Sequence, residues 1–251
     1  MPQLAGFRYY DDYELYFADR ASAEAGLAAL QDALLVFELV LNRAKTQVVT
    51  LPQPLDYGWA LELRRGVMRI REPQHQRDEL VALFEHAFKL IDNGVADHVL
   101  RYTLGLTEEI WLLAKNWPIY EKLLWQSAQI EPAILPTVVL EVLRYRDAGE
   151  PVNTELAARA LNRHILRSLT QACSHEVAWA IWGLIALSAR MDSRSASACC
   201  SSYDPVVGVM MLIAREKGVA NQGYTTANWR QAAKPAALLG DLWLFAYEAA
   251  S

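Results

Sequence analysis

Hydrophobic and polar positions follow two different periods along this chain. In residues 7–17, FRYYDDYELYF, aromatic and apolar residues recur at period two on either side of Asp11 and Asp12. This pattern predicts a strand, a tight turn at the acidic pair and a second strand. Residues 22–37 then predict a helix, and residues 47–51, within the run TQVVTL, predict a further strand.

A connector follows the last of these elements. Pro52 and Pro54 open it, a mixed charged and apolar stretch continues it, and Pro73 closes it. We interpret residues 57–75 as a linker that carries one short strand. The linker separates an N-terminal domain of residues 1–56 from a C-terminal domain of residues 76–251.

The C-terminal domain shows helical periodicity almost throughout. Residues 78–94 predict a helix that stops at Gly94, residues 134–150 one that stops at Gly149, and residues 153–172 one that begins at Asn153 or Thr154. Successive amphipathic helices with short turns predict antiparallel pairs, stacked as a loose solenoid or an irregular bundle. The predicted fold class is therefore α+β, a small hairpin, helix and strand followed by a mostly helical domain.

Composition narrows the functional classes. The 251 residues carry a formal charge of -5 and are 53% hydrophobic, which suits a packed core and argues against a surface that attracts nucleic acid everywhere. Three cysteines give neither a disulfide framework nor metal-ligand spacing, which indicates a reducing, cytoplasmic location. The sequence predicts no membrane span and no secretion signal.

The acidic pair has two readings, a turn favoured by aspartate or a metal site. A second motif bears on the choice. Downstream of the predicted helix lies ELVLNRAKTQVV, in which Leu39 and Leu41 alternate, Asn42 begins a turn, and Lys45 enters the next strand. The order of an aromatic-X-Asp-Asp turn, a helix and Leu-X-Leu-Asn-X-X-Lys-Thr resembles the third and fourth palm motifs of reverse transcriptases.

This resemblance implies roles for particular residues. Tyr9, Tyr10, Asp11 and Asp12 would form the Tyr-X-Asp-Asp box, with the two tyrosines at the substrate. Asp11 would be the principal ligand of a two-Mg²⁺ site, Asp12 would assist, and Lys45 would lie near the departing pyrophosphate. The complete polymerase would use an RNA template, a DNA product and deoxynucleoside triphosphates.

The same resemblance implies parts that this sequence lacks. A reverse transcriptase needs fingers and an upstream palm strand with a further metal-binding aspartate, and only six residues precede Phe7. We therefore expect the chain to be the C-terminal portion of a larger polymerase, with an incomplete metal site and no activity by itself. Its expected partner is an upstream polymerase segment or a second copy of the chain.

The helical domain carries a second resemblance, spread over residues 76–250. Its segments LPTVVLEVLRYRDAGEPV, CSHEVAWAIWGLIAL and DLWLFAYEAA are similar to the helical extension of bacterial defence reverse transcriptases, the group related to abortive-infection polymerases. This implies a role against bacteriophage. Two alternatives stay open, a non-catalytic helical interaction module with an inactive palm remnant, and a helical protein whose acidic turn binds no metal.

Other residues have simpler explanations. Trp179 and Trp182, three apart on one helical face, are expected to pack in the core. His164 is expected on a solvated face. Cys199 and Cys200 are expected to be small, partly buried residues beside a turn.

Overall fold

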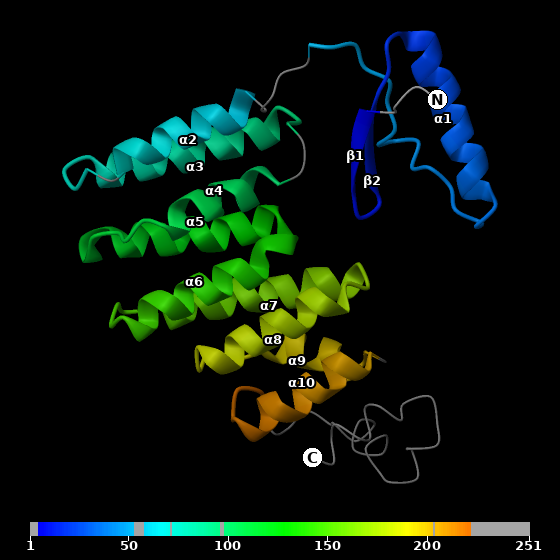
Figure 1. Cartoon of the computed structure of the whole chain (residues 1–251). Helices are drawn as coiled ribbons and strands as arrows, with labels where there is room; N and C mark the ends of the chain where they lie inside the picture. The colour runs from blue at the N-terminus through cyan, green and yellow to red at the C-terminus, as the bar shows by residue number, and fades with distance from the viewer. Residues whose placement is uncertain (1–4, 53–57, 71, 96–97, 203, 222–251) are drawn as a thin grey trace, which may run out of the picture. The chain divides into compact units, whose positions relative to one another are not determined.

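The computed structural model describes residues 5–52, 58–70, 72–95, 98–202 and 204–221. The chain divides into two compact units, Met1–Tyr57 and Gly58–Ser251, which we call the N-terminal unit and the helical unit. The first contains a two-stranded sheet and the second is helical (Figure 1). The α+β class predicted from the sequence is confirmed.

The N-terminal unit begins with the predicted hairpin. Strands β1 (Ala5–Tyr9) and β2 (Asp12–Tyr16) pair antiparallel, with Ala5 opposite Tyr16 and Tyr9 opposite Asp12. The turn consists of Tyr10 and Asp11, and Tyr10 has the left-handed φ of 53° that such tight connections require. The acidic pair therefore lies at the turn, as its sequence predicts.

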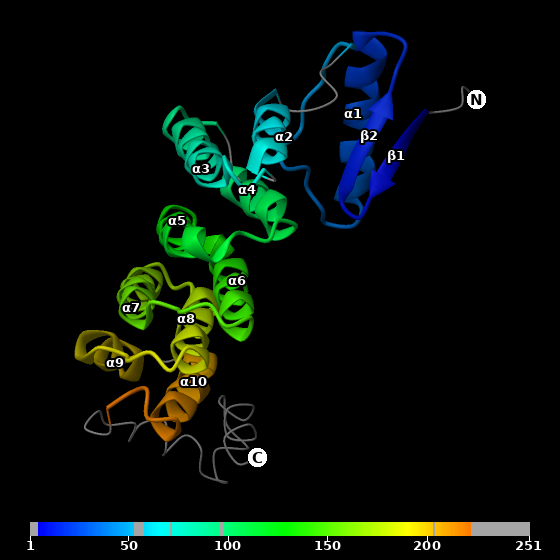
Figure 2. The same cartoon turned by 90° about the vertical axis from the view of Figure 1, so that its left-hand side faces the viewer.

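Helix α1 (Arg20–Leu35) follows and lies beside the hairpin (Figures 1 and 2). The Asp19 carboxylate caps it by accepting the Ser22 N–H at 2.8 Å. The ring of Phe17 lies so close to Gly26 that a Cβ there would come within 2.3 Å of it. The half-buried residues of α1 lie along one side of the helix and are Ala23, Gly26, Leu27, Leu30 and Leu34.

The strand predicted at residues 47–51 does not form. Residues 43–45 are a turn and residues 46–50 have no regular structure. Asn42 fixes that turn, because its side chain accepts the Ala44 N–H at 3.0 Å and its carbonyl accepts the Thr46 N–H at 2.9 Å. The apolar run favours a strand, but a strand needs a neighbour, and the sheet in the described part of the chain consists of β1 and β2.

The helical unit confirms the helical periodicity. Its elements are α2 (Gly58–Ile70), α3 (Gln76–Asp92), α4 (Val99–Glu108), the 3-10 turn η1 (Ala114–Asn116), α5 (Trp117–Ile130), the 3-10 turn η2 (Pro132–Ile134), α6 (Leu135–Asp147), α7 (Thr154–Thr170), α8 (Ser174–Ala186), α9 (Ser193–Cys200) and α10 (Pro205–Glu216). The predicted boundaries are close. Gly94 and Gly149 follow α3 and α6 with φ of 74° and 96°, and the Asn153 side chain caps α7.

These helices stack in two layers, one with α3, α5, α7 and α9 and the other with α2, α4, α6, α8 and α10 (Figure 2). Neighbours in sequence pack across the layers, as α7 does on α8, and alternate helices pack within a layer, as α8 does on α10. This is the predicted solenoid of helix pairs. The predicted helical segment at residues 241–250 lies outside the described residues.

The linker prediction is wrong for residues 58–70. They form α2, which packs against α3 and buries Ala60, Leu63 and Val67. These residues recur every three or four positions, and Pro54 and Pro73 flank the helix rather than interrupt it. Residues 58–70 therefore belong to the helical unit.

The core of the helical unit is one continuous cluster of aliphatic side chains with several large aromatic rings. Its largest fully buried side chains include Trp117, Trp125, Tyr120, Tyr145 and Phe84. Among the helices of the described ranges, none is both long and apolar enough to cross a bilayer.

Candidate functional site

The sequence-predicted site lies on the hairpin. Asp11 is the second residue of the turn, and Asp12 is the first residue of β2. Both are exposed. The turn is held by Arg8, whose Nε donates to the Tyr10 carbonyl at 2.6 Å, and by the Tyr9 and Tyr10 rings, which meet edge to face at 4.9 Å. The four residues of the Tyr-X-Asp-Asp box are therefore consecutive around one tight, supported turn.

One face of the hairpin is open and combines carboxylates with aromatic rings. Because paired residues point to the same side of a sheet, Phe7, Tyr9 and Asp12 share this face with Glu14 and Tyr16. Phe7 is 56% exposed, Tyr9 68% and Tyr16 40%. Tyr16 donates to Glu14 at 2.6 Å, which ties two of these side chains together.

The opposite face of the hairpin is partly covered. Leu15 and Phe17 are half-buried, and Phe17 rests against Gly26 of α1. The two faces thus differ, one packed on a helix and one uncovered.

Exposed apolar side chains occur throughout the described residues of the N-terminal unit, 5–52. None of residues 5–52 is buried. The large apolar side chains exposed there are Phe7, Tyr9, Tyr10, Tyr13, Tyr16, Leu35, Val36, Phe37, Leu39, Val40, Val49 and Leu51. A two-stranded hairpin is marginally stable by itself, and large exposed apolar surfaces are typical of regions that pack against further polypeptide.

Lys45 lies in the turn that Asn42 fixes, and it is exposed. Its backbone N–H donates to the Asn42 carbonyl at 3.0 Å. In residues 5–52, no ion pair joins Lys45 to Asp11 or Asp12. The structure therefore brings the tyrosines and aspartates together and leaves Lys45 on a separate turn.

The hairpin fits Mg²⁺ in the type of donor but supplies only part of a ligand set. Asp11 and Asp12 offer the hard carboxylate oxygens that Mg²⁺ prefers. Within the described residues, no group of three or more His, Cys, Asp or Glu side chains is placed to hold a metal ion. Further ligands would have to come from outside the described hairpin, because Asp11 and Asp12 alone do not complete a two-metal site.

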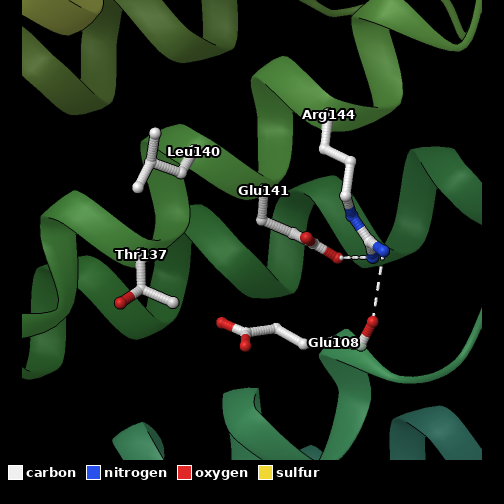
Figure 3. Close-up of a pocket in the computed structure, with 5 residues that line it drawn as sticks. All are labelled: Glu108, Thr137, Leu140, Glu141 and Arg144. Atoms are coloured by element: carbon white, nitrogen blue, oxygen red, sulfur yellow. Dashed lines mark hydrogen bonds and ion pairs between the residues drawn. The ribbon is translucent and has the colours of Figure 1, made fainter.

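A second candidate site lies in the helical unit, where a pocket of about 350 Å³ is lined by Glu108, Thr137, Leu140, Glu141 and Arg144 (Figure 3). Arg144 Nη2 donates to Glu141 Oε1 at 2.6 Å, and its Nη1 donates to the Glu108 carbonyl at 3.1 Å. The Glu108 side chain extends away from the guanidinium (Figure 3). The polar groups of the pocket thus join the end of α4 to α6.

Behind the pocket, the Glu141 carboxylate is buried in a polar network. Tyr120 Oη lies 3.2 Å from Glu141 Oε1 and 3.0 Å from Thr107 Oγ1. Burial, and next the charge of Glu141, raise the pKa of Tyr120 well above its ordinary value, so this hydroxyl stays protonated. The network contains no activated nucleophile, and we assign it a structural role.

An aromatic stack supports the same region. The ring of Tyr145 is sandwiched between Trp117 at 4.4 Å and Trp111 at 4.6 Å, and both pairs are nearly parallel. Tyr145 Oη also accepts the Leu112 N–H at 3.1 Å. Sequence reasoning missed this stack because Tyr145 on α6 is distant in sequence from Trp117 on α5 and from Trp111 in the loop before η1, with no spacing that signals the contact.

The expectations for His164, Cys199 and Cys200 concern burial, and the structure tests each of them. His164 is 1% exposed, so its placement on a solvated face was wrong. Burial lowers the pKa of His164 to about 4, and its Nε2 has no hydrogen-bond partner among the described residues. Cys199 is buried and Cys200 half-buried at the end of α9, which confirms the prediction for this pair.

Comparisons of the chain with protein-family models, with curated proteins and with solved structures found no match.

Proposed function

We propose that this chain supplies part of the palm, together with the helical extension, of a metal-dependent RNA-directed DNA polymerase. The observation that carries the proposal is the open hairpin face, where Asp12 lies among exposed Phe7, Tyr9 and Tyr16, next to Asp11 in the turn. A palm needs carboxylates at a rigid turn, and its sheet is covered by further strands and helices. By resemblance to defence reverse transcriptases, the complete polymerase acts against bacteriophage.

Each element of the hairpin has a part in this proposal. Asp11 and Asp12 supply oxygen ligands, and the Tyr9 and Tyr10 rings contact the nucleotide or primer end. Two Mg²⁺ ions, when bound, stabilise the attacking and leaving oxygens of nucleotidyl transfer. The remaining ligands and the grip on the template come from an upstream polymerase segment that covers the open face.

Two adjacent carboxylates cannot fix two ions in one geometry, so the chain alone should not extend a primer. The test is Mg²⁺-dependent extension of a DNA primer on an RNA template. We expect extension only when the chain is mixed with a polypeptide carrying fingers and the upstream palm strands. The Asp11→Asn variant should abolish it.

The matched control is Asp32→Asn, which removes an exposed carboxylate from α1 without touching the hairpin. It should leave extension by the mixture unchanged. Extension that survives Asp11→Asn would refute the palm assignment. Extension by the chain alone would refute the claim that its site is incomplete.

A further inference from the structure

The pocket between α4 and α6 is built on one face of α6. Thr137, Leu140, Glu141 and Arg144 follow the i, i+3, i+4, i+7 spacing that places side chains in a row along a helix. Glu108, the last residue of α4, lines the pocket from the other side (Figure 3). The pocket volume of about 350 Å³ is within the range of about 300–1,000 Å³ that small-molecule sites occupy. The space therefore suits a small ligand or a single side chain of a partner.

Glu141 uses one carboxylate oxygen in the polar network and leaves the other without a protein partner. The Arg144 guanidinium and the Tyr120 hydroxyl both bond to Oε1, at 2.6 and 3.2 Å. Oε2 receives no hydrogen bond from a described residue, and it is not closed off from solvent. Since the Glu141 side chain is 5% exposed and lines the pocket, this oxygen opens onto the pocket. A carboxylate oxygen that is so largely desolvated is a strong acceptor for a donor that enters from outside.

Two further oxygen acceptors face the same space. The Glu108 side chain extends away from Arg144, toward the Thr137 side of the pocket (Figure 3). Among the described residues, no ion pair or side-chain hydrogen bond occupies the Glu108 carboxylate. Thr137 is half-buried and adds a hydroxyl from the first turn of α6. The pocket thus offers three acceptors, which are Glu141 Oε2, the Glu108 carboxylate and the Thr137 hydroxyl.

The charges of the pocket favour a cation. Glu108 and Glu141 carry two negative charges, and Arg144 balances one of them. Arg144 does not make this an anion site, because its Nη1 and Nη2 donate to the Glu108 carbonyl and to Glu141, and its Nε is closed off from solvent. The guanidinium carbon also lies 5.3 Å from the ring centres of Trp111 and Tyr145, which hold it in place. One negative charge of the pocket is therefore left uncompensated.

A primary ammonium group matches this arrangement in its donors as well as in its charge. It carries three N–H donors and one positive charge, against three oxygen acceptors and one uncompensated negative charge. Leu140, which is 51% exposed, gives the methylene stem of such a ligand an apolar surface to lie on. In the described ranges, no group of three or more His, Cys, Asp or Glu side chains is placed to hold a metal ion, so an organic cation is the better match.

We propose that the pocket between α4 and α6 binds a primary alkylammonium group, either of a free aliphatic amine or of a lysine side chain on a partner. Glu141 Oε2, Glu108 and Thr137 accept hydrogen bonds from its three N–H groups, and the alkyl stem lies along Leu140. This role uses Oε2 of Glu141, whereas Oε1 belongs to the structural network. The proposal concerns the helical unit alone and is independent of the polymerase assignment.

The test is a titration of the full chain with butylamine at neutral pH, followed through the amide signals of residues 137–141 in ¹H–¹⁵N NMR spectra. We expect saturable shifts of these signals. Butanol, which has the same stem without the charge, should cause none. Butyltrimethylammonium, which is charged but has no N–H donor, should bind at least about threefold more weakly, because it makes no hydrogen bonds to the three acceptors.

One variant tests the role of the exposed carboxylate. Glu108→Gln keeps the size of the side chain and removes its charge, so it should weaken the binding of butylamine by at least about threefold. The matched control is Glu216→Gln, which removes the charge of an exposed glutamate at the end of α10 and should leave the binding unchanged.

Two further ligands identify the source of the ammonium group. Tighter binding of 1,4-diaminobutane than of Nα-acetyl-lysine methylamide would support the proposal with a free amine as the ligand. The reverse order would support it with a lysine of a partner. Butylamine that shifts none of the signals of residues 137–141, butanol that shifts them equally, or binding that Glu108→Gln leaves unchanged would each overturn the proposal.

Discussion

Replacing Arg144 by methionine should destabilise the helical unit more than the loss of a partly exposed arginine usually does. The change removes the 2.6 Å ion pair to Glu141 and the 3.1 Å bond to the Glu108 carbonyl. It leaves the Glu141 carboxylate, whose side chain is 5% exposed, with the Tyr120 hydroxyl as its remaining hydrogen-bond partner among the described residues. The loss therefore comes mainly from the carboxylate that stays behind.

The magnitude follows from that burial. Breaking a fully buried ion pair costs about 3–5 kcal/mol, but the Arg144 side chain is 38% exposed and solvent screens part of the interaction. We expect a loss of about 2–3 kcal/mol in the free energy of unfolding. For a unit of this size, that lowers the melting temperature by about 4–12 °C.

A double-mutant cycle measured by urea unfolding checks the reasoning. The Arg144→Met, Glu141→Met chain removes both charges, and an apolar pair of similar volume can fill the site. It should recover at least half of the loss. If the double variant instead lost the sum of the two single losses, the two side chains would not be coupled. An Arg144→Met chain as stable as the unaltered one would refute the account of the network.

Three further predictions concern single positions. As pH falls from about 6.5 toward 4, the free energy of unfolding should drop by up to about 3 kcal/mol. The reason is that His164 binds a proton in the unfolded chain, whereas the buried imidazole, with its pKa lowered to about 4, does not. A His164→Leu chain should lose this part of the pH dependence when unfolding by urea is measured. Gly105→Ala, with open space around its Cβ, should stabilise α4 by about 0.5–1 kcal/mol, whereas Gly183→Ala should give no gain because its Cβ would lie 3.2 Å from Leu161 and Val139. Iodoacetamide at pH 8 should spare Cys199 in the folded chain, since burial raises the pKa of its thiol to about 12, and labelling of Cys199 before unfolding would contradict its buried position.

Local signals predicted the elements well. The period-two pattern around Asp11 and Asp12 predicted the hairpin. Helix boundaries were predicted by the glycines at 94 and 149 and by the cap at Asn153. These features depend on residues within one or two turns of each other. The strand at residues 47–51 failed because a strand also requires a partner, which the local pattern does not contain.

The burial of His164 and the contacts between residues distant in sequence could not be predicted from local patterns. His164 lies beside the exposed residues Arg163 and Arg167 in the sequence, yet α7 buries its side chain. The stack of Trp111, Tyr145 and Trp117 joins a loop to helices α5 and α6, and no spacing in the sequence indicates this contact. For the hairpin, the sequence predicted which residues meet, but the register was needed to place Asp12 on the uncovered face.

The central claim, that Asp11 and Asp12 hold the catalytic metal of a palm, is tested most directly by iron-mediated backbone cleavage. Fe²⁺ takes the oxygen ligands that Mg²⁺ uses, and with ascorbate and peroxide it cuts the polypeptide beside its site. In the mixture with an upstream polymerase segment, we predict cuts within residues 9–14 that excess Mg²⁺ suppresses and Asp11→Asn abolishes. Cleavage that leaves the hairpin intact, or that is the same in the Asp11→Asn variant, would contradict the claim.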